Sequence, residues 1–238
     1  MTKLTRMASL ACILALTFVG CSSKLDPNDP ASIRKWMDKN NIKPTPGTLS
    51  NYLFKGDTTT AALMIKAGID VNGTDDRGNS PLALCANKNK ADMVTFLMEH
   101  GASNDFKNSK GVSPLVDAAS LGNTETVVAM IAQLKKSDPD MLSGVEAMTM
   151  AARQGFAEIV KAFVEAGTPK DAKSPEGWNA MSWAAKNGHT PVIEYLISVG
   201  ADVNVGDKDG YTALDWAKNE GYPAIIKALK KAGAKGKL

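Results

Sequence analysis

Glycines recur at intervals of 33 residues along most of this 238-residue chain. The clearest series consists of Gly78, Gly111, Gly144, Gly177 and Gly210, and two further series keep the same interval. A fixed period of this length is the sequence signature of a repeat architecture, in which each unit packs mainly against its neighbours. We therefore expect an array of similar structural units that stack on one another.

The residues between the glycines indicate that each unit is a pair of helices. Ser80 can cap a first helix with its hydroxyl, and Pro81 occupies the first turn, where a missing N–H costs nothing. Paired small residues such as Ala184-Ala185 allow neighbouring helices to approach closely, and an apolar stripe at helical spacing follows them. Gly200 then permits the left-handed conformation that ends a helix. Because one such unit buries little apolar surface alone, stacking must supply the core.

These motifs resemble the ankyrin repeat, whose pattern joins Thr-Pro-Leu, paired alanines, Gly-His and Gly-Ala-Asp-Val-Asn at these offsets. The fifth repeat matches it closely through Gly188-His189 and residues 200–204, although Asn179 stands where threonine is usual. The resemblance implies an all-α ankyrin-repeat solenoid of about six helix-turn-helix repeats with loop or β-turn fingers. The expected repeats are residues 42–74, 75–107, 108–140, 141–173, 174–206 and 207–238.

Segments that depart from the repeat predict a capping helix and an irregular loop. Asp29-Pro30, followed by an apolar stripe at helical spacing, predicts an N-terminal capping helix over residues 30–41 that covers the first repeat. Residues 135–139 lack the Gly-Ala-Asp ending, and residues 146–147 replace Thr-Pro. We therefore expect the fourth repeat to deviate where it begins. Lysines in the sixth repeat should make its outer face polar, as a terminal repeat requires.

Residues 1–20 have the layout of an export signal, because two basic residues precede an apolar run of 13 residues. That run is too short to span a bilayer as a helix. Its end, Gly20-Cys21, resembles a bacterial lipoprotein signal, in which lipid joins the cysteine thiol and cleavage makes that cysteine the N-terminus. The resemblance implies lipidation at Cys21 and a lipidated tether over residues 21–29. Because Ser22 is not aspartate, it also implies a place in the bacterial envelope, at the periplasmic face of the outer membrane. The alternative is a plain secretory signal with an incidental cysteine.

The sequence offers no arrangement typical of a catalytic, metal or nucleotide site. The chain has two histidines, His100 and His189, which lie 89 residues apart at positions with structural roles in the repeat. Once the signal is removed and Cys21 is lipidated, Cys85 remains alone in an alanine position, so no internal disulfide can form. Without its first 20 residues the chain carries 26 basic and 25 acidic residues, a balance that does not favour nucleic acid. We expect no cofactor, no metal and no enzyme activity.

Three functions stay open at this point. The chain is a protein-binding scaffold at the membrane, a structural or protective envelope component without a dedicated partner, or an enzyme with an unrecognised site. The resemblance favours the scaffold, because ankyrin proteins bind partners along the concave surface formed by loop tips and inner helices. We expect a monomer that has a protein partner and is held to the membrane by its N-terminal lipid.

The candidate contact surface lies in repeats five and six, where large aromatic residues collect at equivalent positions. Trp178 and Tyr211 follow the loop glycines of adjacent repeats, where we expect them to be neighbours, and Trp183 and Trp216 share one inner-helix position. Such rings dominate interface hot spots because each buries a large area at low entropic cost. The alternative is that the rings only pack the loops onto the inner helices. A polar and basic rim, which should prefer an acidic partner patch, is expected from Arg153, Lys186 and Asn187.

Overall fold

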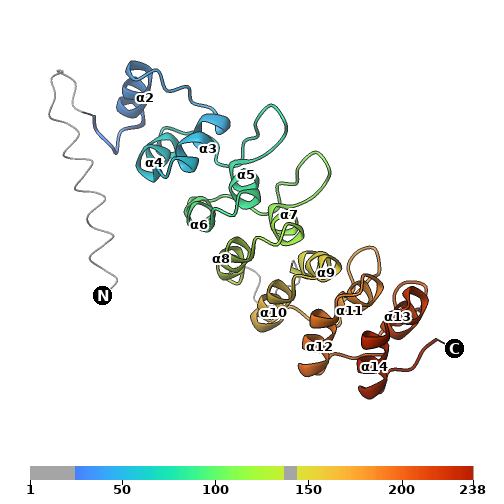
Figure 1. Ribbon diagram of the computed structural model, residues 1–238. Helices are drawn as coiled ribbons and strands as arrows, with labels where there is room; N and C mark the ends of the chain where they lie inside the picture. The colour runs from blue at the N-terminus through green and yellow to red at the C-terminus, as the bar shows by residue number, and fades with distance from the viewer. Residues whose placement is uncertain (1–24, 137–143, 238) are drawn as a thin grey trace, which may run out of the picture.

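Helices occupy most of residues 25–136 and 144–237, the part of the chain that the computed structural model describes (Figure 1). No strand lies among these residues, so the prediction of an all-α solenoid is confirmed for them. The predicted signal peptide, Cys21 and part of the predicted irregular loop lie outside the described residues. The helices are α2 (Pro30–Lys39), α3 (Pro46–Phe54), α4 (Thr58–Lys66), α5 (Pro81–Asn87), α6 (Ala91–Glu99), α7 (Pro114–Ser120), α8 (Thr124–Leu134), α9 (Val145–Gln154), α10 (Ala157–Ala166), α11 (Ala180–Lys186), α12 (Thr190–Ser198), α13 (Ala213–Glu220) and α14 (Pro223–Lys231).

Side-chain caps fix where the first helix of a repeat begins. The Ser80 hydroxyl accepts a hydrogen bond from the Ala83 N–H at 3.2 Å, and Ser113 caps α7 in the same way. In the fifth repeat the side chain of Asn179 accepts from the Ser182 N–H at 2.7 Å. Asparagine thus replaces the usual threonine without loss of the cap, since its side-chain oxygen reaches the same N–H.

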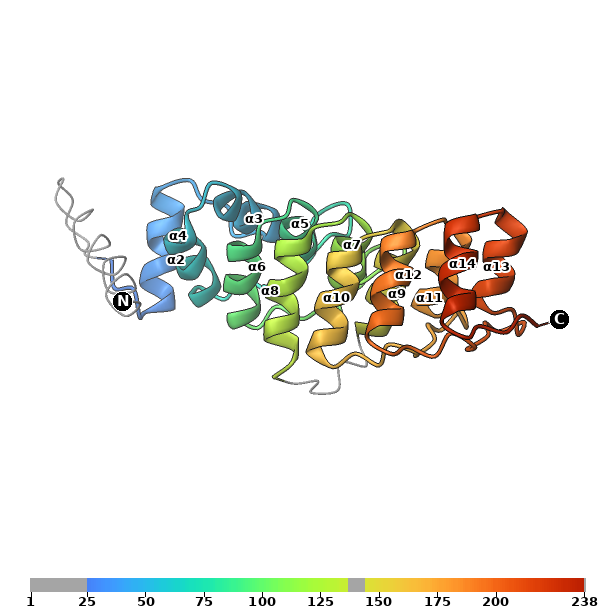
Figure 2. The same ribbon diagram turned by 60° about the horizontal axis from the view of Figure 1, so that its bottom comes forward.

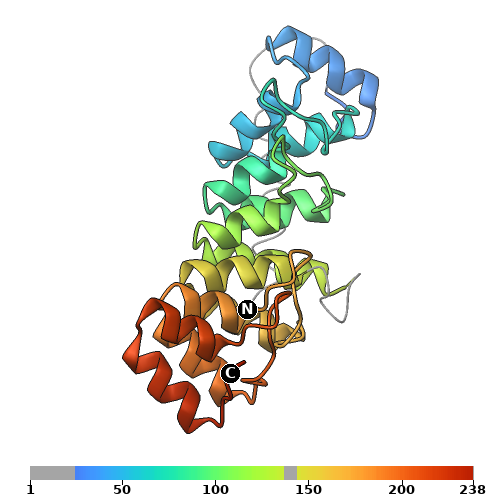
Figure 3. The ribbon, with the colours of Figure 1, turned by 90° about the vertical axis from the view of Figure 1, so that its right-hand side faces the viewer.

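The helices form two rows. The inner row contains α3, α5, α7, α9, α11 and α13, and the outer row runs from α4 to α14 through the even-numbered helices (Figures 1 and 2). Helix α2 packs against α4 at one end of the outer row and buries Ile33 and Met37, as the predicted capping helix should. The loops that join α4 to α5, α6 to α7, α10 to α11 and α12 to α13 extend past the inner row, and we call them fingers (Figures 1 and 3).

The core is a stack of similar layers, one for each helix pair. Paired small residues on the inner helices, such as Ala118-Ala119 and Ala151-Ala152, are fully buried and bring adjacent inner helices into contact. The outer helices contribute larger side chains, of which Phe163 is the largest that is fully buried. Each layer therefore depends on its two neighbours for burial.

The fourth repeat begins differently from the others. Helix α9 starts at Val145, two residues before the position that corresponds to the first residues of α7 and α11. Gly144 has φ of −80°, whereas the equivalent finger glycines Gly111 and Gly177 have φ of +75° and +83°. Gly144 therefore does not adopt the left-handed conformation of its equivalents, and α9 begins early. The predicted deviation is confirmed for the described part of this repeat.

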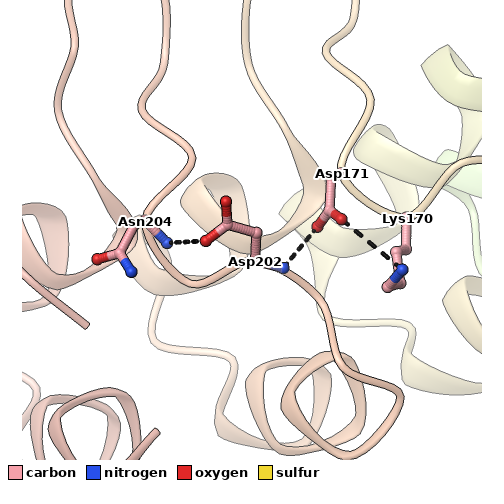
Figure 4. Close-up of polar contacts among 4 residues, drawn as sticks. All are labelled: Lys170, Asp171, Asp202 and Asn204. Carbon is pink, nitrogen blue, oxygen red and sulfur yellow. Dashed lines mark hydrogen bonds and ion pairs between the residues drawn. The ribbon is translucent and has the colours of Figure 1, made fainter. Parts of the chain in front are cut away.

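A row of hydrogen bonds joins successive loops, and we call it the loop ladder. The side chain of Asn72 accepts from the Ser103 N–H at 2.9 Å. Asp171, at the equivalent position three repeats later, accepts from the Asp202 N–H at 2.9 Å (Figure 4). Lys170 also lies 3.8 Å from the Asp171 carboxylate, while Asp202 accepts from the N–H of Asn204. Each rung of the ladder holds one repeat at a fixed distance from the next.

The segment after α14 continues the same ladder. Asn204 accepts from the Lys235 N–H at 2.7 Å, in the manner of the rungs before it. The Lys237 N–H donates to both oxygens of Asp215, at 3.1 and 2.9 Å. The Lys237 ammonium donates to the Asp209 carbonyl at 2.7 Å. Residues 234–237 are thereby held against the last finger.

A second kind of joint covers the glycines that end inner helices. Rings from the following repeat lie over Gly122, Gly155 and Gly188, and a Cβ atom at these positions would come within 2.6 to 2.8 Å of them. At Gly155 the covering ring is His189, whose Nε2 also hydrogen-bonds the Arg153 carbonyl at 2.9 Å. The structural role predicted for His189 is therefore a contact between repeats four and five.

Candidate functional site

Four aromatic side chains meet on the inner row of repeats five and six, and we call them the aromatic cluster: Trp178, Trp183, Tyr211 and Trp216. Trp178 and Tyr211 come from fingers, and Trp183 and Trp216 come from α11 and α13. The Trp178 ring centroid lies 4.2 Å from that of Trp183 and 4.9 Å from that of Trp216. Tyr211 extends the cluster, because its ring centroid lies 5.7 Å from that of Trp216. The structure thus brings together all four rings that the sequence selected.

The members of the aromatic cluster differ in exposure. Trp178 is only 9% exposed, because its finger turns the ring back between Trp183 and Trp216. For Trp178 the structure favours the alternative role, because its buried ring packs the finger onto the inner helices. Tyr211 is 45% exposed, and Trp183 and Trp216 are half-buried. These three present ring surface to solvent.

Three cations lie over the rings. The Arg153 guanidinium carbon is 4.5 Å from the Trp183 ring centroid, and the Lys186 ammonium is 4.3 Å from that of Trp216 and 4.9 Å from that of Trp178. The expected rim residues Arg153 and Lys186 therefore lie over the rings of the aromatic cluster and not around its edge. Cations are attracted to the negative face of an aromatic ring, which accounts for this placement.

The third cation escaped the sequence analysis. Lys237 Nζ lies 4.3 Å from the Tyr211 ring centroid, where the hydrogen bonds of residues 234–237 hold it. Lys237 follows α14 at the position that Asn72, Asp171 and Asn204 hold in earlier repeats, and because none of these is a cation, the repeat pattern gave no signal for it. Among residues 25–136 and 144–237, none of the three cations has a carboxylate oxygen within 4 Å.

The third expected rim residue, Asn187, has a local role. Its side-chain amide donates to the Trp183 carbonyl at 3.0 Å, at the end of α11. Asn187 is nevertheless exposed beside the cluster. It ends the helix that carries Trp183 and Lys186.

Asp207 positions the aromatic cluster, a role that its place in the loop of the sixth repeat did not reveal. It is 3% exposed and accepts from the backbone N–H groups of Asp209 and Tyr211, at 2.9 and 3.0 Å. Its other oxygen accepts from the Trp216 indole N–H at 2.9 Å. One carboxylate therefore fixes both the finger that carries Tyr211 and the orientation of the Trp216 ring.

Asp215 plays a similar part at the start of α13. Its carboxylate accepts from the Thr212 N–H at 2.9 Å and from the Thr212 hydroxyl at 2.8 Å. The first of these bonds, together with the Asp215 N–H that donates to the Thr212 side chain, forms a capping box. Burial raises the pKa of Asp215, but the hydrogen bonds from Thr212 and Lys237 outweigh this effect and lower that pKa below its ordinary value. The ionised carboxylate therefore holds the segment that carries Lys237.

Cys85 and His100, the side chains considered for catalysis, have surroundings that indicate a structural role. Cys85 is fully buried, and burial raises the pKa of its thiol to about 12, so the reactive thiolate is disfavoured. His100 Nδ1 hydrogen-bonds the Phe96 carbonyl at 2.8 Å, near the end of α6. In the described part of the chain, no three His, Cys, Asp or Glu side chains are placed to hold a metal ion together. Nor do these residues include a helix with the length and apolar character needed to cross a membrane.

Comparison with known proteins shows which family has this architecture. The family model for ankyrin repeats (3 copies) matches residues 50–143 and 146–237. The crystallised ankyrin repeat protein EF0377 is 27% identical, with a TM-score of 0.65 over 78% of this chain and 98% of its own. An ankyrin repeat domain from Acinetobacter baumannii AYE is 26% identical, with a TM-score of 0.65 over 79% of this chain and 98% of its own. No curated protein matches the chain. Because the family model covers well over half of the sequence, the chain belongs to the ankyrin repeat family.

Proposed function

We propose that this protein is a protein-binding scaffold of the bacterial envelope, held by lipid on Cys21, and that the aromatic cluster is its contact surface. Ankyrin repeats are generally binding scaffolds, which supports the broad role. The observation that carries the location is the gathering of Trp183, Trp216 and Tyr211 with three cations on one face of the inner row. Trp, Tyr and Arg are the residues most enriched in interface hot spots.

Packing of the fingers onto the inner helices does not by itself explain why Tyr211 is exposed in the aromatic cluster. Trp178 packs its finger onto the inner helices with little ring surface left in solvent, so the finger is already anchored. Tyr211 is attached to the same cluster but leaves 45% of its surface exposed. An exposed ring that is held rigid by its neighbours buries area on binding at a small entropic cost, which favours a contact role for Tyr211.

Capture of a partner tests the contact surface. Tyr211→Ala should weaken capture of an envelope protein by the full chain about tenfold or more, as expected for a hot-spot tyrosine. The melting temperature should change little, because the side chain is half in solvent. Phe106→Ala is the matched control, since Phe106 is a 46% exposed aromatic in the loop between α6 and α7, outside the cluster. Equal capture by the two variants would remove Tyr211 from the contact surface.

Anchoring by lipid rests on residues 1–21, and the tether limits how far the solenoid stands from the membrane. Eight residues lie between Cys21 and Pro30, the first residue of α2, so nine Cα-to-Cα steps join the two. Even fully extended, such a segment spans at most about 32 Å. A lipid on Cys21 would therefore keep the array close to the membrane surface. Several acyl chains on one residue give stable anchoring, whereas one chain binds only marginally.

Labelled fatty acid tests the anchor directly. The wild-type chain, expressed in a Gram-negative bacterium, should incorporate the label and sediment with membranes. Cys21→Ser should abolish incorporation and move the protein to the soluble periplasmic fraction, because the thiol that accepts the lipid is gone. Cys12→Ser is the matched control and should keep both label and membrane association. Membrane association that survives Cys21→Ser without label would show that the N-terminal lipid does not anchor the protein.

A further inference from the structure

Two of the cations that lie over the aromatic cluster repeat along the inner row. Arg153 and Lys186 occupy the same position in consecutive repeats, 33 residues apart, on α9 and α11. Lys237 adds a third cation over the ring that α13 and its finger present. Adjacent packed helices lie about 8 to 10 Å apart, so the Arg153 and Lys186 charges repeat at about that spacing.

None of the three cations forms an ion pair within the part of the chain that the structure describes. A ring face attracts a cation but carries no net charge, so the three cations keep theirs. Carboxylates of the same two repeats are held by other donors: Asp207 by Trp216 and its own finger, Asp215 by Thr212 and the Lys237 N–H, and Glu176 by the Ser174 hydroxyl at 2.8 Å. The surface therefore presents apolar ring area beside three cations that have no carboxylate within 4 Å among the described residues.

We propose that the aromatic cluster selects an acidic segment of a partner protein, bound in an extended conformation across α9, α11 and α13. This rests on the proposed function. A polyproline II segment, which is one form of extended chain, has three residues per turn and advances about 3.1 Å per residue. Carboxylates three residues apart then lie on one face, about 9 Å from each other, and meet successive cations. The residues between the carboxylates lie on the exposed faces of Trp183, Trp216 and Tyr211.

The residues that earlier repeats carry at the position of Trp183 and Trp216 determine where the acidic segment ends. Asp117 on α7 occupies the position that Trp183 and Trp216 hold two and three repeats later. A carboxylate there repels an acidic chain, whereas Met150 on α9 is neutral. The segment therefore covers the fourth to sixth repeats and does not extend to the third.

Selection of peptides tests this specificity. Random 12-residue peptides displayed on phage are selected on the purified full chain, and on Tyr211→Ala in parallel. Peptides enriched on the wild type should carry two or more Asp or Glu residues spaced about three apart. Replacement of those residues by Asn or Gln in a synthetic copy should weaken binding about tenfold or more, followed by quenching of tryptophan fluorescence.

Charge variants of the protein test which cations bind the acidic peptide. Lys186→Gln and Arg153→Gln should each weaken an enriched acidic peptide up to about fivefold, the effect of removing one exposed ion pair. Lys186→Arg should bind within twofold of wild type, because it keeps both the charge and the ring contact. Lys227→Gln and Lys161→Gln remove the same charge from exposed sites on α14 and α10, and should change binding less than twofold.

The outcomes of these experiments distinguish a failure of the acidic specificity from a failure of the proposed contact surface. Enriched peptides that are neutral, yet depend on Tyr211, would leave the contact surface in place and overturn its acidic specificity. A twelve-nucleotide oligothymidylate that binds as tightly as the acidic peptide would also overturn it, because the surface would then take any polyanion. If no peptide is enriched on the wild type over Tyr211→Ala, both proposals fail.

Discussion

Trp178→Ala should lower the free energy of unfolding by about 3 kcal/mol or more, within the range seen when a buried tryptophan is cut to alanine. The ring is 9% exposed and lies between Trp183 and Trp216, so its loss leaves a cavity beneath the finger. Urea unfolding, followed by circular dichroism, measures the change. The loss is concentrated in repeats five and six, so a separate early transition of these repeats is an acceptable form of the result.

Tyr211→Ala is the matched comparison for Trp178→Ala. Both residues follow a finger glycine in the repeat, but Tyr211 is 45% exposed and its removal should cost less than about 1 kcal/mol. If the two substitutions had equally small effects, the Trp178 ring would be dispensable for packing. Its place between two other indoles would then have to serve binding.

Gly155→Ala should cost about 2 to 4 kcal/mol. Gly155 ends α9 in the left-handed region, with φ of +86°, where a Cβ costs about 1 to 2 kcal/mol. The new Cβ would also lie 2.6 Å from His189 Nδ1, so the ring must move and give up its hydrogen bond to the Arg153 carbonyl. A lost hydrogen bond of this kind costs about 1 kcal/mol. The measurement is again urea unfolding.

Gly221→Ala separates the two causes. Gly221 holds the equivalent position at the end of α13, with φ of +76°, and nothing lies within 4 Å of a Cβ built there. This variant should show only the backbone cost, about 1 to 2 kcal/mol. Equal losses for Gly155→Ala and Gly221→Ala would mean that the His189 ring yields freely and that the joint between repeats four and five contributes little.

Much of the fold could be predicted from the sequence because its determinants are local and repeated. Ser80 and Ser113 mark helix starts through short hydrogen bonds within one turn. The 33-residue period then assigns equivalent places in space to equivalent positions in the chain, which is why the convergence of Trp183 and Trp216 could be inferred. The early start of α9 was visible as a break in that period, although not its extent.

The 33-residue period could not predict how individual side chains are oriented. Trp178 and Tyr211 hold equivalent positions, yet one ring is buried and the other is exposed, because Trp178 has two indoles to pack between and Tyr211 has one. Arg153 and Lys186 turn onto rings instead of standing apart as a rim, since a cation gains more over an indole face than alone in solvent. Lys237 reaches the cluster through contacts that only the folded chain creates.

The loop ladder has a consequence for how such a protein changes over time. In the rungs formed by Asn72, Asp171 and Asn204, the donor is a main-chain N–H of the following loop. Every residue except proline carries that N–H, so the rung makes almost no demand on the neighbour's side chains. A duplicated unit could join the array through the same bonds while its finger and inner-helix residues diverged. The bonds of the loop ladder stay the same, and the residues of the fingers and inner helices are left free to change.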